Sequence, residues 1–231
     1  MPDFSQSAAG LEPPTVVDHI LLPVGDLALG ARQLQEKVGL QALEGGRHAT
    51  GGTANYIVPL GLQYLELIAV VDEKEAVDSR LGLRVMQSVK RGRTFVAWAL
   101  RTADLDALRQ KLLDAGWELP AIVEGSRTRP DGQVLSWRTQ DIAMGSEQSA
   151  IPFVIEWKVP DGLHPGQAPA AHPVGEASIV RVVVGAQDPD RVREQLEMLL
   201  GESDFYEVRW ADADGVEAIV IEHPGGKTVL R

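Results

Sequence analysis

The polar residues that interrupt apolar stretches of this sequence are the ones that could do chemistry. His19 lies in "VVDHILLP", Glu66 in "YLELIAV" and Glu156 in "IPFVIEW". Burying such a group is costly unless it finds a partner or takes part in a reaction. Imidazole and carboxylate groups also carry protons in many enzymes. The alternatives are a hydrogen-bonded core histidine for His19 and a surface pair with Lys158 for Glu156.

Glu66 has the clearest pattern of the three. It alternates along its run with Tyr64 and Ile68, so a strand would send the carboxylate to the same side as large apolar groups. A glutamate in that position is rarely left unpaired, which favours a role in a pocket. We therefore expect His19 and Glu66 to open into the same cavity.

His48 and Asn55 flank a glycine pair in "GRHATGGTAN". No Lys-Ser/Thr pair follows the glycines, so the stretch is not a phosphate-binding P-loop. Glycines at the end of a strand permit a bulge or a close backbone approach to a ligand. We expect His48 and Asn55 at a pocket rim, as a hydrogen-bonding pair that contacts substrate. The alternative is a plain turn, with Asn55 bonded to its own backbone.

The loop "EGSRTRPDGQVLSWR" concentrates Arg127, Arg129 and Arg138 in an acidic protein. Guanidinium groups bind carboxylates and phosphates, so the loop indicates an anionic substrate, held in particular by Arg127 and Arg138. A solvated loop that balances nearby acids is the other interpretation. Trp137 and Trp157 could form an apolar pocket wall, or could belong to the core.

The elements that must position these residues come from a repeat. Three segments share one layout, in which an aspartate (Asp26, Asp104 or Asp188) separates a β-rich run from an amphipathic helix that ends at a glycine. Each aspartate is expected to cap its helix. Strand-like segments follow each helix, so the sequence predicts a β-α-β-β-β unit used three times in an α+β protein.

The units divide the chain into expected parts. Residues 16–160 hold two units, which form a curved-sheet cup. Residues 161–175 are a linker rich in Pro, Gly and Ala, and residues 176–231 are a third, shorter unit. An odd third unit leaves an apolar sheet face without a partner. It either packs against the first two units or pairs with a second chain, and we expect a homodimer.

Composition limits the kinds of partner. The net charge of -11 argues against nucleic acid and anionic membranes, because both require a cationic surface. No apolar run approaches the roughly 20 residues that span a bilayer. With no cysteine, the chain has neither disulfides nor thiolate ligands, which fits a cytoplasmic location. Small molecules remain as the expected ligands, and no nucleotide-binding motif is found.

The tandem unit resembles the vicinal oxygen chelate superfamily, which includes glyoxalase I, extradiol dioxygenases and bleomycin-resistance proteins. Within the superfamily, the sequence is similar to the glyoxalase-like domain group. The motifs that carry this similarity are "DHILLPVGDL", "GRHATGGTANYIVPLG", "YLELIAV", "RPDGQVLSW", "IPFVIEW", "HPG" and "AHP". The resemblance implies a cup with a divalent metal ion inside. Carried over residue by residue, the implied metal ligands are His19, Glu66 and Glu156, while the fourth position is occupied by Ala97.

The resemblance implies two functions. The first is a glyoxalase- or dioxygenase-type enzyme, a lyase, isomerase or dioxygenase, in which a metal ion chelates two adjacent substrate oxygens and Glu66 or Glu156 is the general base. The second is a metal-free protein that binds or sequesters a small molecule, as bleomycin-resistance proteins do. The alanine at position 97 leaves both open.

Overall fold

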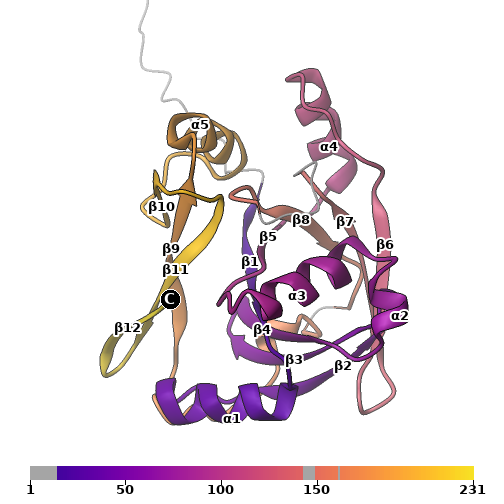
Figure 1. Ribbon diagram of the computed structural model, residues 1–231, viewed down its shortest axis with the longest axis vertical. Helices are drawn as coiled ribbons and strands as arrows, with labels where there is room; N and C mark the ends of the chain where they lie inside the picture. Colours follow the sequence, from indigo (N-terminus) through magenta and orange to yellow (C-terminus); the bar gives the residue numbers. More distant parts are fainter. Residues whose placement is uncertain (1–14, 143–148, 161) are drawn as a thin grey trace, which may run out of the picture.

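The computed structural model of the protein describes residues 15–142, 149–160 and 162–231. The first two units close into an eight-stranded barrel, and the third forms a separate four-stranded sheet beside it (Figure 1). The elements are, in order, β1 (Val16–Pro23), α1 (Leu27–Val38), β2 (Leu43–His48), β3 (Thr53–Leu60), β4 (Gln63–Val70), α2 (Glu73–Ala76), α3 (Arg80–Lys90), β5 (Ala97–Arg101), α4 (Leu105–Asp114), β6 (Val123–Thr128), β7 (Val134–Gln140), β8 (Phe153–Trp157), the 3₁₀ helix η1 (Pro165–Gln167), β9 (Ser178–Ala186), α5 (Pro189–Leu200), β10 (Tyr206–Trp210), β11 (Gly215–His223) and β12 (Gly226–Leu230).

The two units of the barrel have the same strand order. In the first unit β1 pairs in parallel with β4, which continues through β3 to β2; in the second, β5 pairs in parallel with β8, which continues through β7 to β6. The units join edge to edge, because β1 pairs with β5 and β2 with β6, both antiparallel. The predicted α+β class and tandem β-α-β-β-β units are therefore confirmed, and the cup is a closed barrel.

The predicted helix caps are also confirmed. Asp26, Asp104 and Asp188 each accept a hydrogen bond from the backbone N–H three residues later. These bonds satisfy one of the amide groups that the first turn of a helix leaves without a partner. Gly39 follows α1 in the left-handed conformation, at a φ of 71°, which a residue with a side chain rarely adopts.

One helix per unit was expected, but two further helices follow the first unit. Asp72 caps the short helix α2 and Ser79 caps α3. The buried residues of α3 include a glycine, an arginine and a serine, so its buried apolar face is small. The helix matters because its first turn borders the cavity described below.

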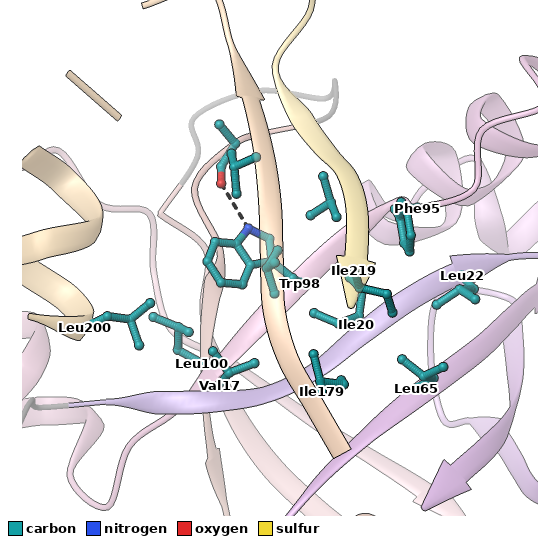
Figure 2. Close-up of a cluster of buried hydrophobic side chains, with 14 of the residues drawn as sticks. Val17, Ile20, Leu22, Leu65, Phe95, Trp98, Leu100, Ile179, Leu200 and Ile219 are labelled. Carbon is teal, nitrogen blue, oxygen red and sulfur yellow. Dashed lines mark hydrogen bonds between the residues drawn. The ribbon is translucent and has the colours of Figure 1, made fainter. Parts of the chain in front are cut away.

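The third unit has the predicted order of elements but a different strand order. In the barrel units the first strand pairs with the last, whereas β9 lies inside its sheet between β10 and β11, and β12 is at the edge. This sheet packs on the outer side of the barrel. Figure 2 shows Ile179 of β9 and Ile219 of β11 beside Ile20 and Trp98 of the barrel, and all four belong to one buried cluster.

Polar contacts hold the third unit in the same place. Thr15 Oγ1 donates to the carbonyl of Leu199 at 2.8 Å, and Thr94 Oγ1 donates to the carbonyl of Arg231 at 2.7 Å. The structure thus shows the first of the two predicted arrangements, in which the third unit covers its own chain. The homodimer stays a prediction, but the apolar face that suggested it is covered by the barrel of the same chain.

The segment expected to be a linker runs along the barrel rather than away from it. His172 Nδ1 accepts a hydrogen bond from the N–H of Gln41 at 3.0 Å, and its Nε2 lies 2.6 Å from the carbonyl of Pro59. A few residues earlier, His164 is buried at the start of η1. This part of the chain therefore reaches back to the first unit, and His164 contributes to the site.

Candidate functional site

The barrel encloses a cavity of about 340 Å³. Strands of both units supply its walls, and the first turn of α3 borders it. Strand alternation decides which side chains enter: Tyr64 and Glu66 of β4 line the cavity, while Leu65 between them belongs to the outer core. The predicted site residues that line it are His19, His48, Asn55, Glu66, Arg127 and Trp137.

A bulge in β1 brings two neighbouring residues into the interior. The pairing of β1 with β5 shifts between Val17 and His19, so Asp18 is the extra residue. Successive residues of a strand normally face opposite sides, and a bulge removes that restriction. Asp18 and His19 are both buried, and Asp18 Oδ2 lies 2.8 Å from His19 Nδ1. Since a carboxylate only accepts, His19 carries a proton on Nδ1.

Glu66 is held at one oxygen and open at the other. Asn55 Nδ2 donates to Glu66 Oε1 at 2.6 Å, and the second oxygen, Oε2, lies 3.5 Å from His19 Nε2. With Nδ1 of His19 protonated by its contact to Asp18, Nε2 of the neutral ring has a lone pair. Two electron-rich atoms therefore face each other inside the cavity. The two atoms repel each other unless they share a proton or accept hydrogen bonds from a common donor.

His48 is fixed as a neutral imidazole. Asn55 Nδ2 lies 3.2 Å from His48 Nε2, so its second N–H points to an accepting nitrogen, and His48 Nδ1 donates to Thr53 Oγ1 at 2.7 Å. Burial lowers the pKa of His48, Glu66 acts in the opposite direction, and the positive charge of Arg127 adds to the lowering. His48 and Asn55 are a hydrogen-bonded pair as expected, but both are buried in the wall rather than exposed at a rim.

Asp18 is the centre of a buried network. His164 Nε2 lies 2.9 Å from Asp18 Oδ1, and Trp157 Nε1 donates to Asp18 Oδ2 at 3.2 Å. Arg101 approaches the same carboxylate at 3.5 Å. Burial alone would raise the pKa of Asp18, but the hydrogen bonds from His164 and His19 outweigh it and hold that pKa well below its usual range. Asp18 is thus a charged group that orients His19.

Aromatic rings complete the walls. Tyr64 stacks on His19, with ring centroids 4.5 Å apart and planes 12° apart, and so packs against one face of the imidazole. Trp137 meets Trp157 edge to face, and a Cβ added at Gly125 would lie 2.3 Å from Trp137 Nε1. Only a glycine leaves room for this indole. The cavity therefore combines a polar side with an aromatic side, as small-molecule sites do.

Arg127 is a cation of the cavity wall, which Arg80 and Arg84 of α3 also border. The side chain of Arg127 is 4% exposed, and Nη1 donates to the carbonyl of Gly45. It lies opposite His48 in the pairing of β2 with β6. Burial lowers the pKa of Arg127, while the nearby Tyr64 and Glu66 raise it.

Two predicted site residues lie outside the cavity. In β8, Phe153, Ile155 and Trp157 line it, so Glu156 between them faces outward. Its carboxylate is held by Arg138 at 3.1 Å and by Lys158 at 2.9 Å. Arg138 in turn pairs with Asp106 of α4 at 2.7 Å. Strand alternation thus places Glu156 and Arg138 on the outer face, on the other side of the strands from the cavity that Glu66 lines, which differs from the expected arrangement.

The residues present do not fit the metal centre that the resemblance implied. Glu156 is on the other side of its strand, and Ala97 lines the cavity with only a methyl group. Asn55 occupies one oxygen of Glu66. Throughout the described ranges, no group of three or more His, Asp or Glu side chains is arranged to hold a metal ion. We therefore derive the chemistry of this site from the side chains alone.

Sequence reasoning missed the buried partners Asp18 and His164. Asp18 precedes His19 directly, where a regular strand would send it to the opposite face. His164 belongs to the "HPG" motif that carried the family resemblance, and that motif was the available signal.

The comparisons with known proteins agree with the fold. The family model described as "Glyoxalase-like domain" matches residues 17–200, so the match continues through the predicted linker as far as α5. No curated protein matches the chain. In the described ranges no helix is long and apolar enough to cross a membrane.

Solved structures match the chain at low sequence identity, and one of them has a similar architecture over most of its length. A hypothetical protein from Staphylococcus aureus has a TM-score of 0.73 and 18% identity, over 90% of this chain and 90% of that one. A Streptomyces coelicolor methylmalonyl-CoA epimerase in complex with 2-nitronate-propionyl-CoA has a TM-score of 0.46 and 19% identity, over 65% of this chain and 100% of that one. The methylmalonyl-CoA epimerase from Mycobacterium tuberculosis has a TM-score of 0.45 and 18% identity, over 66% of this chain and 92% of that one.

Proposed function

Because the chain belongs to the glyoxalase-like domain family of the vicinal oxygen chelate superfamily, we propose that it is an enzyme that moves a proton on a small substrate inside its barrel. Glu66 is the group that exchanges the proton, and His19, oriented by Asp18, is the second acid–base group. The substrate has a C–H bond next to a carbonyl group.

The observation that carries this proposal is the pair of facing atoms, Glu66 Oε2 and His19 Nε2, at 3.5 Å. Each group is held at its other polar atom, Glu66 Oε1 by Asn55 and His19 Nδ1 by Asp18. Groups held in this way lose little freedom when the substrate binds, which is how positioning lowers a reaction barrier. A substrate C–H or O–H in the cavity beside the two atoms would meet both a base and a hydrogen-bonding partner.

Glu66 and His19 have different roles in the proposed reaction. Glu66 takes the proton from the substrate carbon, and the electron pair of the broken bond moves to the carbonyl oxygen. His19, once Nε2 has taken up a proton from solvent, donates to that oxygen, and the negative Asp18 stabilises the imidazolium. Return of the proton from Glu66 to the same or the adjacent carbon gives an epimer or an isomer. Apart from the proton that His19 takes from solvent, no step in this sequence requires a group other than these side chains.

A metal-free binding protein is the second candidate, and the aromatic wall favours it. Tyr64, Phe153, Trp137 and Trp157 give the cavity the apolar surface that a sequestering protein uses. Binding alone, however, gives no reason to orient two acid–base groups toward each other. Proton exchange into a bound compound separates the two functions.

The test is hydrogen exchange in D₂O. Small carbonyl compounds (2-oxo acids, α-hydroxy ketones and acyl thioesters) are incubated with the protein, and ¹H NMR follows the signal of the C–H next to the carbonyl. We expect at least one compound to exchange with the native protein and at least 100-fold more slowly with Glu66→Gln. Compounds that bind but do not exchange would support the binding protein instead.

Metal use is tested on the same samples. Elemental analysis of protein purified without chelator is expected to find no stoichiometric divalent metal, and exchange is expected to survive EDTA. A bound metal whose removal abolishes exchange would contradict the proposed division of work between Glu66 and His19.

A further inference from the structure

Among the described residues, no carboxylate forms an ion pair with the buried Arg127, and Glu66 acts on it only from a greater distance. The side chain of Arg127 is 4% exposed. It donates a hydrogen bond to the neutral carbonyl of Gly45. An isolated buried charge is costly, and proteins rarely keep one that is not compensated.

The other arginines of this region show the contrast. Arg138, on the outer side of the neighbouring strand β7, is paired with both Asp106 and Glu156. Arg129, two residues after Arg127, pairs with Asp131 at 3.2 Å. Arg80 and Arg84, which also line the cavity, lie 3.4 and 3.3 Å from the carboxylate of Asp141. Among the cavity-lining arginines of the described residues, Arg127 is therefore the one without a carboxylate at ion-pairing distance, so its charge is directed to something that enters the cavity.

Arg127 lies beside the acid–base groups. Its Nη1 and the side chain of Asn55 both pack against Gly45, where an added Cβ would be 2.9 Å from Arg127 Nη1 and 2.1 Å from Asn55 Oδ1. The amide of Asn55 reaches on to Glu66. A group bound to Arg127 therefore has its next atoms near the carboxylate that exchanges the proton.

We propose that Arg127 binds a carboxylate of the substrate, so that the substrate is a small carboxylic acid with its reactive carbon close to the carboxylate. The inference rests on the proposed function, because this subsite belongs to the same cavity as Glu66. A monoanion fits the charge, since a single guanidinium offers one positive charge and two parallel donors. A phosphate dianion would place a second negative charge near Glu66.

The test uses phenylacetate and its neutral analogue phenylacetamide, which have similar shape and suit an aromatic-walled cavity. Calorimetry on the full chain measures both dissociation constants. We expect the native protein to prefer phenylacetate, and Arg127→Gln to weaken phenylacetate binding about 30-fold or more without a comparable change for the amide. Arg129→Gln and Arg138→Gln are the matched controls and are expected to keep the preference.

Several results would overturn the proposal. Equal binding of acid and amide to the native protein, or an undiminished preference in Arg127→Gln, would show that Arg127 does not bind the carboxylate. Tighter binding of inorganic phosphate that depends on Arg127 would assign a different anion. If Arg127→Gln does not fold, Arg127→Lys keeps the charge but loses the second donor, and we expect it to lower phenylacetate affinity at least threefold.

Glu66→Gln distinguishes this proposal from the proposed function. The variant is expected to bind phenylacetate at least as tightly as the native protein, because a neighbouring negative charge is removed. Arg127-dependent binding together with unchanged hydrogen exchange in Glu66→Gln would refute the role of Glu66 and leave the carboxylate subsite standing.

Discussion

At the scale of single residues, the site depends on how polar groups inside the barrel hold one another. Asp18 accepts hydrogen bonds from His19, His164 and Trp157, while Glu66 has one fixed and one open oxygen. Two buried carboxylates in the same barrel thus have different surroundings. Asp18, whose oxygens both accept hydrogen bonds, supports the structure and orients its neighbours. Glu66, with one oxygen open, is available for a substrate.

This difference predicts opposite effects of two amide substitutions. Glu66→Gln keeps the size of the side chain and an acceptor for Asn55, so we expect the free energy of unfolding to change by only about 1 kcal/mol while hydrogen exchange is lost. Asp18→Asn removes the charge at the centre of the network and is expected to cost about 3–5 kcal/mol. Urea denaturation measures both, and a larger loss for Glu66→Gln would identify Glu66 as structural.

The neutral His48 predicts how stability depends on pH. Its pKa in the folded protein is lowered from 6.5, so on acidification the unfolded chain takes up a proton before the folded one. The stabilisation from neutral His48 is complete above pH 6.5 and is lost as the pH falls toward the lowered pKa. We expect the free energy of unfolding to decrease from pH 7 to pH 5.

The control for this pH effect is a variant series. His48→Gln is expected to flatten the decrease between pH 7 and pH 5, whereas His223→Gln, in a less buried position on β11, leaves it in place. Asp18 has a lowered pKa as well and acts in the same direction, but only below its usual value of 3.8. An unchanged slope in His48→Gln would show that His48 is not the group responsible.

At the scale of elements, a bulge and a short helix create the network. The bulge in β1 turns Asp18 inward, and η1 presents His164 to it. The N–H of Gly166 donates to His164 Nδ1 at 3.2 Å, which leaves the proton of the neutral ring on Nε2, facing Asp18. A segment expected to be a linker therefore fixes a charge in the first strand.

This contact predicts that η1 stabilises the barrel. His164→Phe keeps a ring but removes the donor, and we expect a loss of about 3 kcal/mol because it weakens the support of a buried carboxylate. Hydrogen exchange of the substrate should also slow, since His19 loses part of its orientation. His172→Phe, which affects backbone contacts of the same segment, is the comparison: an equal slowing of substrate exchange there would show that the segment as a whole, not the contact to Asp18, is responsible.

At the scale of the whole molecule, the third unit covers the outer side of the barrel. Ile219 and Ile179 are fully or almost fully buried against Ile20 and Trp98 (Figure 2). The opposite face carries ion pairs such as Arg209 with Glu217. One face of the sheet is thus apolar and covered, while the other is charged.

This packing predicts the effect of a charge in the contact. Ile219→Asp buries an unpaired carboxylate and is expected to cost more than about 3 kcal/mol, whereas Glu222→Gln on the same strand should change stability by less than about 0.5 kcal/mol. Sedimentation of the native chain tests the predicted homodimer. A dimer at micromolar concentration would have to use a surface other than the covered face of β9 and β11.

The sequence by itself determined the elements and part of the site. Asp26, Asp104 and Asp188 marked the helix starts because capping is a local interaction. Glu66 was placed inside by its alternation with Tyr64 and Ile68, which also needs only neighbouring residues. The repeat then predicted the tandem units.

Only the tertiary structure determined which face of its strand a side chain occupies and which distant residues it contacts. Glu156 was open to two interpretations, because the face of a strand reverses with a shift of one residue, and the barrel turns it outward to Arg138 and Lys158. The bulge at Asp18 depends on the pairing of β1 with β5, and His164 reaches Asp18 from 146 positions away in the chain. Such contacts form only when segments far apart in the chain come together around the barrel, so the "HPG" motif could mark His164 but no local pattern predicts its contact with Asp18.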